Sequence, residues 1–207
     1  MKTKGQKLFY SNSSHLFCCH YLLLLLFLQK NFPLKTIQDV EANLQVSSKK
    51  AVIRVAKAVE ENLQLADELF ELAISNRQPL AWRAAWTFSY LSDCNSPAIE
   101  RYIPRVVNAL LHITHHGQRG CFYRILSHSS FKVEEYSELL DFSIDILLKP
   151  TIRASHKFYC LDVLEKFAVQ IPELRGELIM VVEAALPNFE TETLKRKGYL
   201  WLQRMRD

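Results

Sequence analysis

The sequence predicts an all-α protein, an α-solenoid of stacked antiparallel helix pairs. From residue 36 onward, apolar residues recur at helical spacing and almost nowhere alternate as they do in β-strands. Apolar positions also recur at a shift of 36 to 38 residues along the chain. Glycine is scarce, with 5 in 207 residues, which disfavours folds that depend on glycine hairpins or phosphate-binding loops.

About ten helices are expected, and the apolar run at 16–28 is a candidate additional N-terminal helix. The expected helices span 36–46, 48–60, 62–75, 79–91, 97–113, 118–129, 133–148, 151–168, 172–186 and 190–205. In 133–148, for example, Tyr136, Leu140 and Ile144 form one apolar stripe. Short connections of mostly two to six residues make consecutive helices antiparallel.

Prolines mark the starts and connections of these helices. They are Pro79, Pro97, Pro150, Pro172 and Pro187. Pro104 lies inside an apolar-periodic segment, so we expect either a kink or a short first turn before it.

The internal repeat is clearest when 118–149 is laid over 156–187. Leu126 then aligns with Leu164, and Leu140 aligns with Leu178. The preceding unit aligns with a shift of 36 to 37 residues. A helix pair that recurs at this period is typical of an α-solenoid, whose units bury their apolar faces only by stacking.

The segment from Pro79 to Trp86 (PLAWRAAW), followed by Leu91 and by Ile103 to Leu111 (IPRVVNALL), resembles a HEAT-type repeat. The resemblance covers about 47–205 and is strongest over 79–187, and the chain resembles in particular small bacterial HEAT-like proteins of unknown activity. It implies a right-handed solenoid whose second helices line the concave surface. Gly117 and Gly120 depart from the family pattern, so we expect the 118–129 helix to start late or fray.

The chain divides into an N-terminal extension, residues 1–35, and a repeat domain, residues 36–207. The extension carries five of the 26 Lys and Arg and none of the 22 Asp and Glu, so the domain retains 21 basic and 22 acidic side chains. Leu16 to Leu28 is apolar apart from His20, but a membrane span needs about 20 such residues. An added helix, a poorly ordered extension, a membrane anchor, a signal-like segment and a misassigned start remain open.

Cysteine usage indicates a reducing compartment. The five cysteines are odd in number, and the three in the domain are scattered without a C-x-x-C pair. We therefore expect a cytoplasmic protein, with association to a membrane through 16–28 as the alternative.

The repeat alignment places one basic side chain near the start of each first helix. We call this set the basic row: Arg83, Arg119, Lys157 and Lys195, which lie 36, 38 and 38 residues apart. Such a row is a candidate binding site for an acidic protein segment or a phosphate backbone. The alternative is that each side chain pairs with a carboxylate of the neighbouring unit or faces water.

The second helices of the C-terminal half carry acidic side chains that recur at the same shift. We call this set the acidic ridge: Glu134, Glu138, Asp141, Asp145, Glu173 and Glu177. It is a candidate binding surface that disfavours nucleic acid, and the alternative is a solvated helix face.

Two smaller features are candidates for binding. Trp82 lies one residue before Arg83 and four before Trp86, so it is a candidate aromatic anchor, although core packing explains most such residues. His112, His115 and His116 have helical spacing but lack a nearby Cys, Asp or Glu, so no metal and no cofactor are expected.

No catalytic motif is present in the sequence: G-x-S-x-G, H-E-x-x-H, a phosphate loop and the mobile loop of fumarase-type lyases are all missing. We therefore expect a non-catalytic protein-binding or scaffold module with a protein or peptide partner. One alternative resembles the HEAT-like alkylpurine DNA glycosylases, for which Trp82, Trp86 and Asp93 are the candidates. The charge balance of the domain argues against it. The other alternative is a membrane-tethered adaptor anchored through 16–28.

Overall fold

The repeat region is entirely helical in the part of the chain that the structure covers. The structure is a computed structural model that describes residues 33–207, so the apolar run at 16–28 and the prediction of a helix there lie outside the described residues. Lys35–Asp207 form one unit, in which the described residues form ten α-helices and no strand. No helix in 33–207 combines the length and hydropathy that a membrane crossing needs.

The helices lie close to the predicted ranges. The α-helices are α2 (Ile37–Leu44), α3 (Lys49–Glu61), α4 (Leu63–Ile74), α5 (Leu80–Asp93), α6 (Ile103–His112), α7 (His116–His128), α8 (Ser137–Leu148), α9 (Ala154–Gln170), α10 (Arg175–Ala185) and α11 (Glu192–Arg206). Short 3-10 helices are η1 (Pro97–Tyr102), η2 (Val133–Glu135), η3 (Pro172–Leu174) and η4 (Leu186–Asn188). The all-α prediction is therefore confirmed.

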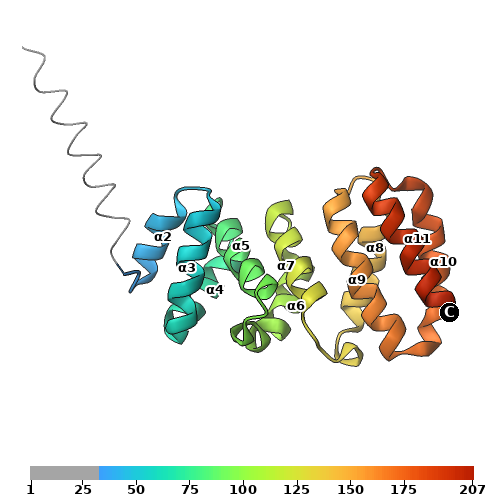
Figure 1. Cartoon of the computed structure of the whole chain (residues 1–207), viewed down its shortest axis with the longest axis horizontal. Helices are drawn as coiled ribbons and strands as arrows, with labels where there is room; N and C mark the ends of the chain where they lie inside the picture. Colours follow the sequence, from blue (N-terminus) through green and yellow to red (C-terminus); the bar gives the residue numbers. More distant parts are fainter. Residues whose placement is uncertain (1–32) are drawn as a thin grey trace, which may run out of the picture. The chain divides into compact units, whose positions relative to one another are not determined.

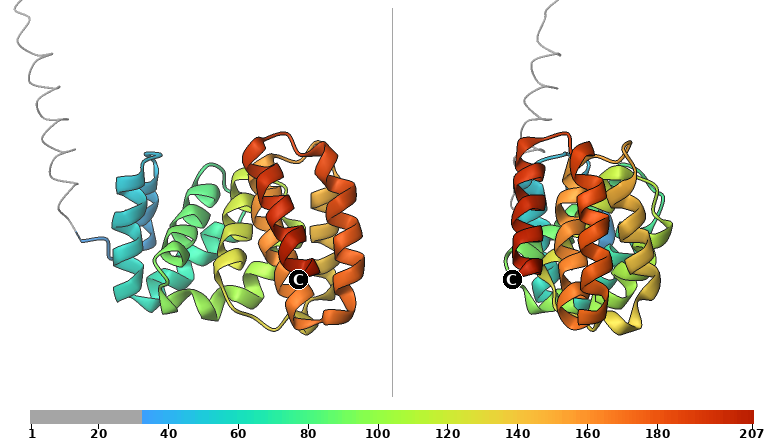
Figure 2. Two further views of the ribbon diagram at one scale, coloured as in Figure 1. Left: turned by 45° about the vertical axis from the view of Figure 1, so that its right-hand side comes forward. Right: turned by 90° about the vertical axis from the view of Figure 1, so that its right-hand side faces the viewer.

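The helices of residues 35–207 form two layers. In the first layer, α3, α5, α7, α9 and α11 each pack on the next (Figure 1). In the second layer, α2 packs on α4, α6 on α8, and α8 on α10. Each first-layer helix also packs on a second-layer helix next to it in sequence, as in α3 with α4 and α8 with α9 (Figure 2). This is the stacking of helix pairs that the repeat predicts.

Local sequence explains where several helices begin. Thr36 and Asp39 form a capping box, in which the Thr36 N–H donates to Asp39 Oδ2 at 2.9 Å and the Asp39 N–H donates to Thr36 Oγ1 at 3.3 Å. Ser48, Asn62 and Thr191 cap α3, α4 and α11 through their side-chain oxygens.

The second helices of three units begin with a 3-10 turn. The segment predicted as 97–113 consists of η1 and α6, and Pro104 is the second residue of α6. Its missing N–H costs nothing there, because the first helical N–H groups have no intrahelical partner. Of the two outcomes expected for Pro104, the structure shows a short first turn before it.

The expectation that the 118–129 helix starts late was wrong, because α7 begins at His116 and includes Gly117 and Gly120. A Cβ on Gly117 would stand 2.6 Å from Trp82 Nε1, and one on Gly120 would stand 3.1 Å from the His156 ring. Both glycines therefore let α5 and α9 pack closely on α7, and neither ends the helix.

Aromatic side chains fill the core where α4, α5 and η1 meet. The Phe70 ring stacks on Tyr102 at 4.6 Å between centroids and meets Phe88 edge-on at 5.2 Å. Phe122 from α7 joins this cluster and is fully buried. These contacts join successive units, so the core is continuous along the stack.

Candidate binding surfaces

The basic row keeps the register that the repeat predicts. Arg83, Arg119, Lys157 and Lys195 are each the fourth residue of their helices, α5, α7, α9 and α11. Their surroundings differ, however, and these decide which of them can meet a partner.

The two arginines bind backbone carbonyl groups at the ends of second-layer helices. Arg83 Nη1 donates to the carbonyl oxygens of Leu44 and Gln45, both at 2.8 Å, at the end of α2. Arg119 donates from Nε at 3.2 Å and from Nη2 at 2.6 Å to the carbonyl oxygen of Ile113, the C-cap residue of α6. Cations are favoured there because the last carbonyl groups of a helix lack intrahelical donors and carry partial negative charge.

The two lysines of the row have opposite exposures. Lys157 is 2% exposed, and its Nζ has no hydrogen-bond partner. Burial lowers the pKa of the Lys157 ammonium, and the charge of Glu190 opposes this shift. The Lys195 side chain is 38% exposed, and its Nζ lies 2.9 Å from Glu192 Oε1 on the same helix.

The basic row is therefore not one exposed surface. Arg83 and Arg119 hold carbonyl groups, Lys157 is buried, and Lys195 pairs within its own helix. Binding of an acidic segment by these four residues stays a prediction, and the four side chains do not form one common surface for such a segment.

The acidic ridge is open to solvent. Its six carboxylates lie on η2, α8, η3 and α10, all are exposed, and α8 packs beside α10. Asp145 Oδ2 accepts a hydrogen bond from Lys149 Nζ at 2.6 Å. Among the described residues, the other five, Glu134, Glu138, Asp141, Glu173 and Glu177, form no ion pair.

Trp82 is half-buried and held between neighbours. Its ring stacks on Trp86 with centroids 6.1 Å apart and lies 6.4 Å from the His115 ring. Its indole also covers Gly117. Trp82 is thus fixed in place by α5 and α7, and its use as an anchor stays a prediction.

The three candidates for a DNA glycosylase all lie on α5, but the carboxylate is occupied. Asp93 Oδ1 accepts a hydrogen bond from Arg124 Nε at 2.8 Å and lies 3.3 Å from His128 Nδ1. The Asp93 carboxylate is therefore already engaged by two side chains of α7.

His115 and His116 have separate contacts. His115 Nδ1 accepts a hydrogen bond from the Gln118 N–H at the start of α7, and the His116 ring lies 5.8 Å from the His156 ring. In the region from 33 to 207, no three potential metal-ligating side chains gather.

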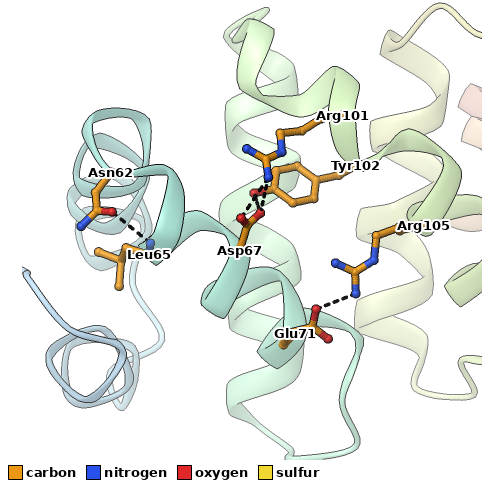
Figure 3. Close-up of polar contacts among 7 residues, drawn as sticks. All are labelled: Asn62, Leu65, Asp67, Glu71, Arg101, Tyr102 and Arg105. Carbon is orange, nitrogen blue, oxygen red and sulfur yellow. Dashed lines mark hydrogen bonds and ion pairs between the residues drawn. The ribbon is translucent and has the colours of Figure 1, made fainter.

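Sequence reasoning missed a set of polar contacts between α4 and the next second-layer segment (Figure 3). Arg101 Nη2 donates to both oxygens of Asp67, at 2.8 and 2.9 Å, and Tyr102 Oη donates to Asp67 Oδ1 at 2.7 Å. One turn away, Arg105 Nη2 donates to Glu71 Oε1 at 2.6 Å. Acid and base lie 34 residues apart in both pairs, which is less than the repeat shift of 36 to 38 residues, so that shift does not point to them.

Gln118 was also missed, and it is only 1% exposed. Its Nε2 donates to the carbonyl oxygens of Ala73 at 2.7 Å and Ser75 at 3.0 Å, at the end of α4. Gln118 therefore does for α4 what Arg83 does for α2. Both contacts connect a first-layer helix to the second-layer helix that lies three helices before it in the chain, α5 to α2 and α7 to α4.

Two layers of helix pairs, joined by such contacts at near-repeat spacing, define an α-solenoid repeat protein. The profile of the HEAT repeat domain matches residues 40–197. The chain therefore belongs to the HEAT repeat domain family, as the sequence predicted. No curated protein and no solved structure gave a significant match.

Proposed function

We propose that this HEAT repeat protein is a non-catalytic binding module whose acidic ridge recognises a basic segment of a partner protein. The family supports an interaction module of the repeat type. The observation that carries the finer proposal is that five exposed ridge carboxylates on adjacent segments have no ion-pair partner within residues 33–207. Some carboxylates elsewhere in the stack, such as Asp67, Asp93 and Asp162, are paired.

The charge of the ridge selects the chemistry of the partner. Glu134, Glu138 and Asp141 lie within eight residues on η2 and α8, and Glu173 and Glu177 lie on the neighbouring η3 and α10. Several carboxylates on adjacent helices attract Lys- and Arg-rich segments and repel phosphate backbones. A protein or peptide partner with basic side chains therefore suits this surface, and nucleic acid does not.

The test measures binding of a fluorescein-labelled octa-arginine peptide by fluorescence anisotropy at low and moderate salt. The ridge variant combines Glu138→Lys, Asp141→Lys and Glu173→Lys. A matched control combines Glu60→Lys, Glu61→Lys and Glu100→Lys, which are exposed carboxylates without ion pairs among the described residues. Both variants change the net charge equally.

We expect the ridge variant to bind the peptide at least about tenfold more weakly than the wild type, and the control variant to bind it nearly as well. Binding by the wild type should weaken with salt, because it depends on exposed charges. Equal loss in both variants would show that only the net charge matters, and the proposal would then fail.

We also infer a cytoplasmic location. Cys94, Cys121 and Cys160 are all free thiols, and burial raises the pKa of Cys121 and of Cys160 to about 12. Such thiols are inert and suit a reducing compartment. Fractionation of cells that express the tagged full chain tests this inference, and recovery in the membrane fraction would contradict it.

A further inference from the structure

The two helices that carry the acidic ridge also expose apolar side chains. Among the second-layer helices of residues 33–207, the exposed large apolar side chains are Leu63, Leu148 and Met180. Leu63 is the first residue of α4, whereas Leu148 lies on α8 and Met180 on α10, where they are 41% and 65% exposed. A single exposed apolar side chain is ordinary on a protein surface, so the position of these two relative to the carboxylates decides what they mean.

On α8 the apolar side chains form a strip beside the carboxylates. Leu140, Ile144 and Leu148 lie four residues apart and therefore share one flank of the helix. Leu140 and Ile144 are half-buried, and Leu148, the last residue of the helix, is exposed. Asp141 and Asp145 each follow a member of this strip by one residue and are exposed, so carboxylates line the solvent side of the strip.

On α10 more than one turn of the helix is entirely apolar. Residues 178–182 read LIMVV, so an apolar side chain has to face solvent there, and Met180 does. Met180 lies three residues after Glu177, which places both side chains on the same exposed face of the helix. An apolar side chain therefore interrupts the acidic face of α10.

The carboxylates beside these apolar side chains have no ion-pair partner among residues 33–207. They are Glu138 and Asp141 on α8, Glu173 on η3 and Glu177 on α10. Because α8 packs beside α10, the exposed apolar and acidic side chains of both helices lie on one outer surface of the second layer.

The segment that suits this surface is a helix with one apolar face and basic flanks. In such a helix the apolar residues recur at three- and four-residue spacing, and charged residues lie on either side of them. It covers apolar side chains and pairs its cations with carboxylates at the same time, whereas a purely basic segment leaves Leu148 and Met180 in water.

We propose that the acidic ridge recognises a basic amphipathic helix of a partner protein, whose apolar face packs on Leu148 and Met180 while its Lys and Arg side chains pair with the ridge carboxylates. This inference rests on the proposed recognition of a basic segment and adds the conformation and the apolar face of that segment. Burial of the two apolar side chains adds affinity that salt does not screen.

The test compares two fluorescein-labelled peptides of Ala, Lys and Leu, each of about 18 residues so that a helix can form. The leucines of the first peptide lie on one face of the helix, and those of the second, which has the same composition, are spread around it. At moderate salt the wild type should bind the first peptide about tenfold more tightly, because only its leucines can cover Leu148 and Met180 together. Fluorescence anisotropy measures both affinities.

Two double variants locate the apolar contact. Leu148→Ser with Met180→Ser should remove the preference for the first peptide and should bind octa-arginine like the wild type, because its charges are unchanged. The matched control is Leu63→Ser with Val169→Ser, which removes side chains that are 57% and 59% exposed from α4 and α9. The control should keep the preference, and circular dichroism checks that both variants retain their helices.

The outcomes separate this inference from the proposed function. Equal affinity of the wild type for the two peptides, or equal effects of the two double variants on the preference, would overturn the inference and leave recognition of a basic segment standing. Self-association of the wild type that Leu148→Ser with Met180→Ser abolishes would assign these side chains to a second copy and would also overturn it. A ridge variant that binds octa-arginine as tightly as the wild type would overturn the proposed function, and the inference with it.

Discussion

Replacing Lys157 by methionine should make the protein more stable. Lys157 is buried on α9, its Nζ has no hydrogen-bond partner, and its pKa is lowered by burial from the ordinary value of 10.5. A buried polar group without a partner costs about 1–3 kcal/mol, and the attraction to Glu190 returns at most about 1 kcal/mol. Methionine has a similar length and fills irregular apolar space well. We therefore expect a gain of about 1–2 kcal/mol in the free energy of unfolding, which raises Tm by roughly 2–8 °C for a domain of this size.

Urea denaturation at pH 7 measures this gain, and Lys195→Met is the matched control. Lys195 is the fourth residue of α11, as Lys157 is of α9, but it is partly exposed and pairs with Glu192. The control substitution should change the free energy of unfolding by less than about 0.5 kcal/mol and should not stabilise the fold. A Lys157→Met variant that loses more than about 1 kcal/mol would refute the reasoning, because the ammonium would then have a net favourable partner.

The pH dependence supplies an independent check. Since the pKa of Lys157 is lower in the folded than in the unfolded chain, the unfolded chain binds more protons between the two pKa values, and wild-type stability rises with pH there. The advantage of Lys157→Met should therefore shrink as the pH approaches 10.5. An advantage that stays constant up to that pH would contradict a buried, titrating ammonium.

Two further predictions concern the packing around α7. Gly117→Ala should lower the free energy of unfolding by about 1–3 kcal/mol, because the new Cβ would stand 2.6 Å from Trp82 Nε1. A Cβ on Gly176 of α10 meets nothing within 4 Å, so Gly176→Ala should stabilise the fold by about 0.5–1 kcal/mol. Urea denaturation of both variants checks this contrast, and equal effects would contradict it. Burial lowers the pKa of His156 to about 4 from an ordinary value of 6.5. The free energy of unfolding should therefore be unaffected by His156 above pH 6.5 and should decline as the pH falls toward 4, by no more than about 3 kcal/mol. Urea titrations at several pH values measure this decline, and His156→Gln should lack it.

The sequence predicted the helices and the register of the basic row well, because both depend on periodicity alone. An apolar stripe at 3.6-residue spacing fixes a helix, and a repeat shift fixes which residues share a position. Arg83, Arg119, Lys157 and Lys195 accordingly fall at one position of four helices. This part of the architecture needs no knowledge of side-chain direction.

The surroundings of these residues could not be predicted in the same way. The carbonyl groups that Arg83 binds belong to α2 and lie 38 and 39 residues earlier in the chain, and nothing in the spacing of basic residues indicates them. Gly117 and Gly120 depart from the family pattern, and this departure predicts a late or frayed start of the helix. The contacts of Trp82 and His156 with α7 reverse this reading, because close packing between units outweighs propensity.

The acidic surface of the domain comes from the way its charged side chains are paired, and not from its net charge. Residues 36–207 have 21 basic and 22 acidic side chains. If every charged side chain formed an ion pair, the domain would have almost no electrostatic field at its surface. Arg83 and Arg119, however, are bound to carbonyl groups, and Lys157 is buried. Cations used in this way leave carboxylates unmatched elsewhere. In the part of the chain that the structure describes, many of the unmatched carboxylates lie on the neighbouring α8 and α10 and the 3-10 turns before them. The stacking of the repeats thus leaves an acidic surface on a nearly neutral domain, and the proposed recognition of a basic partner rests on this surface.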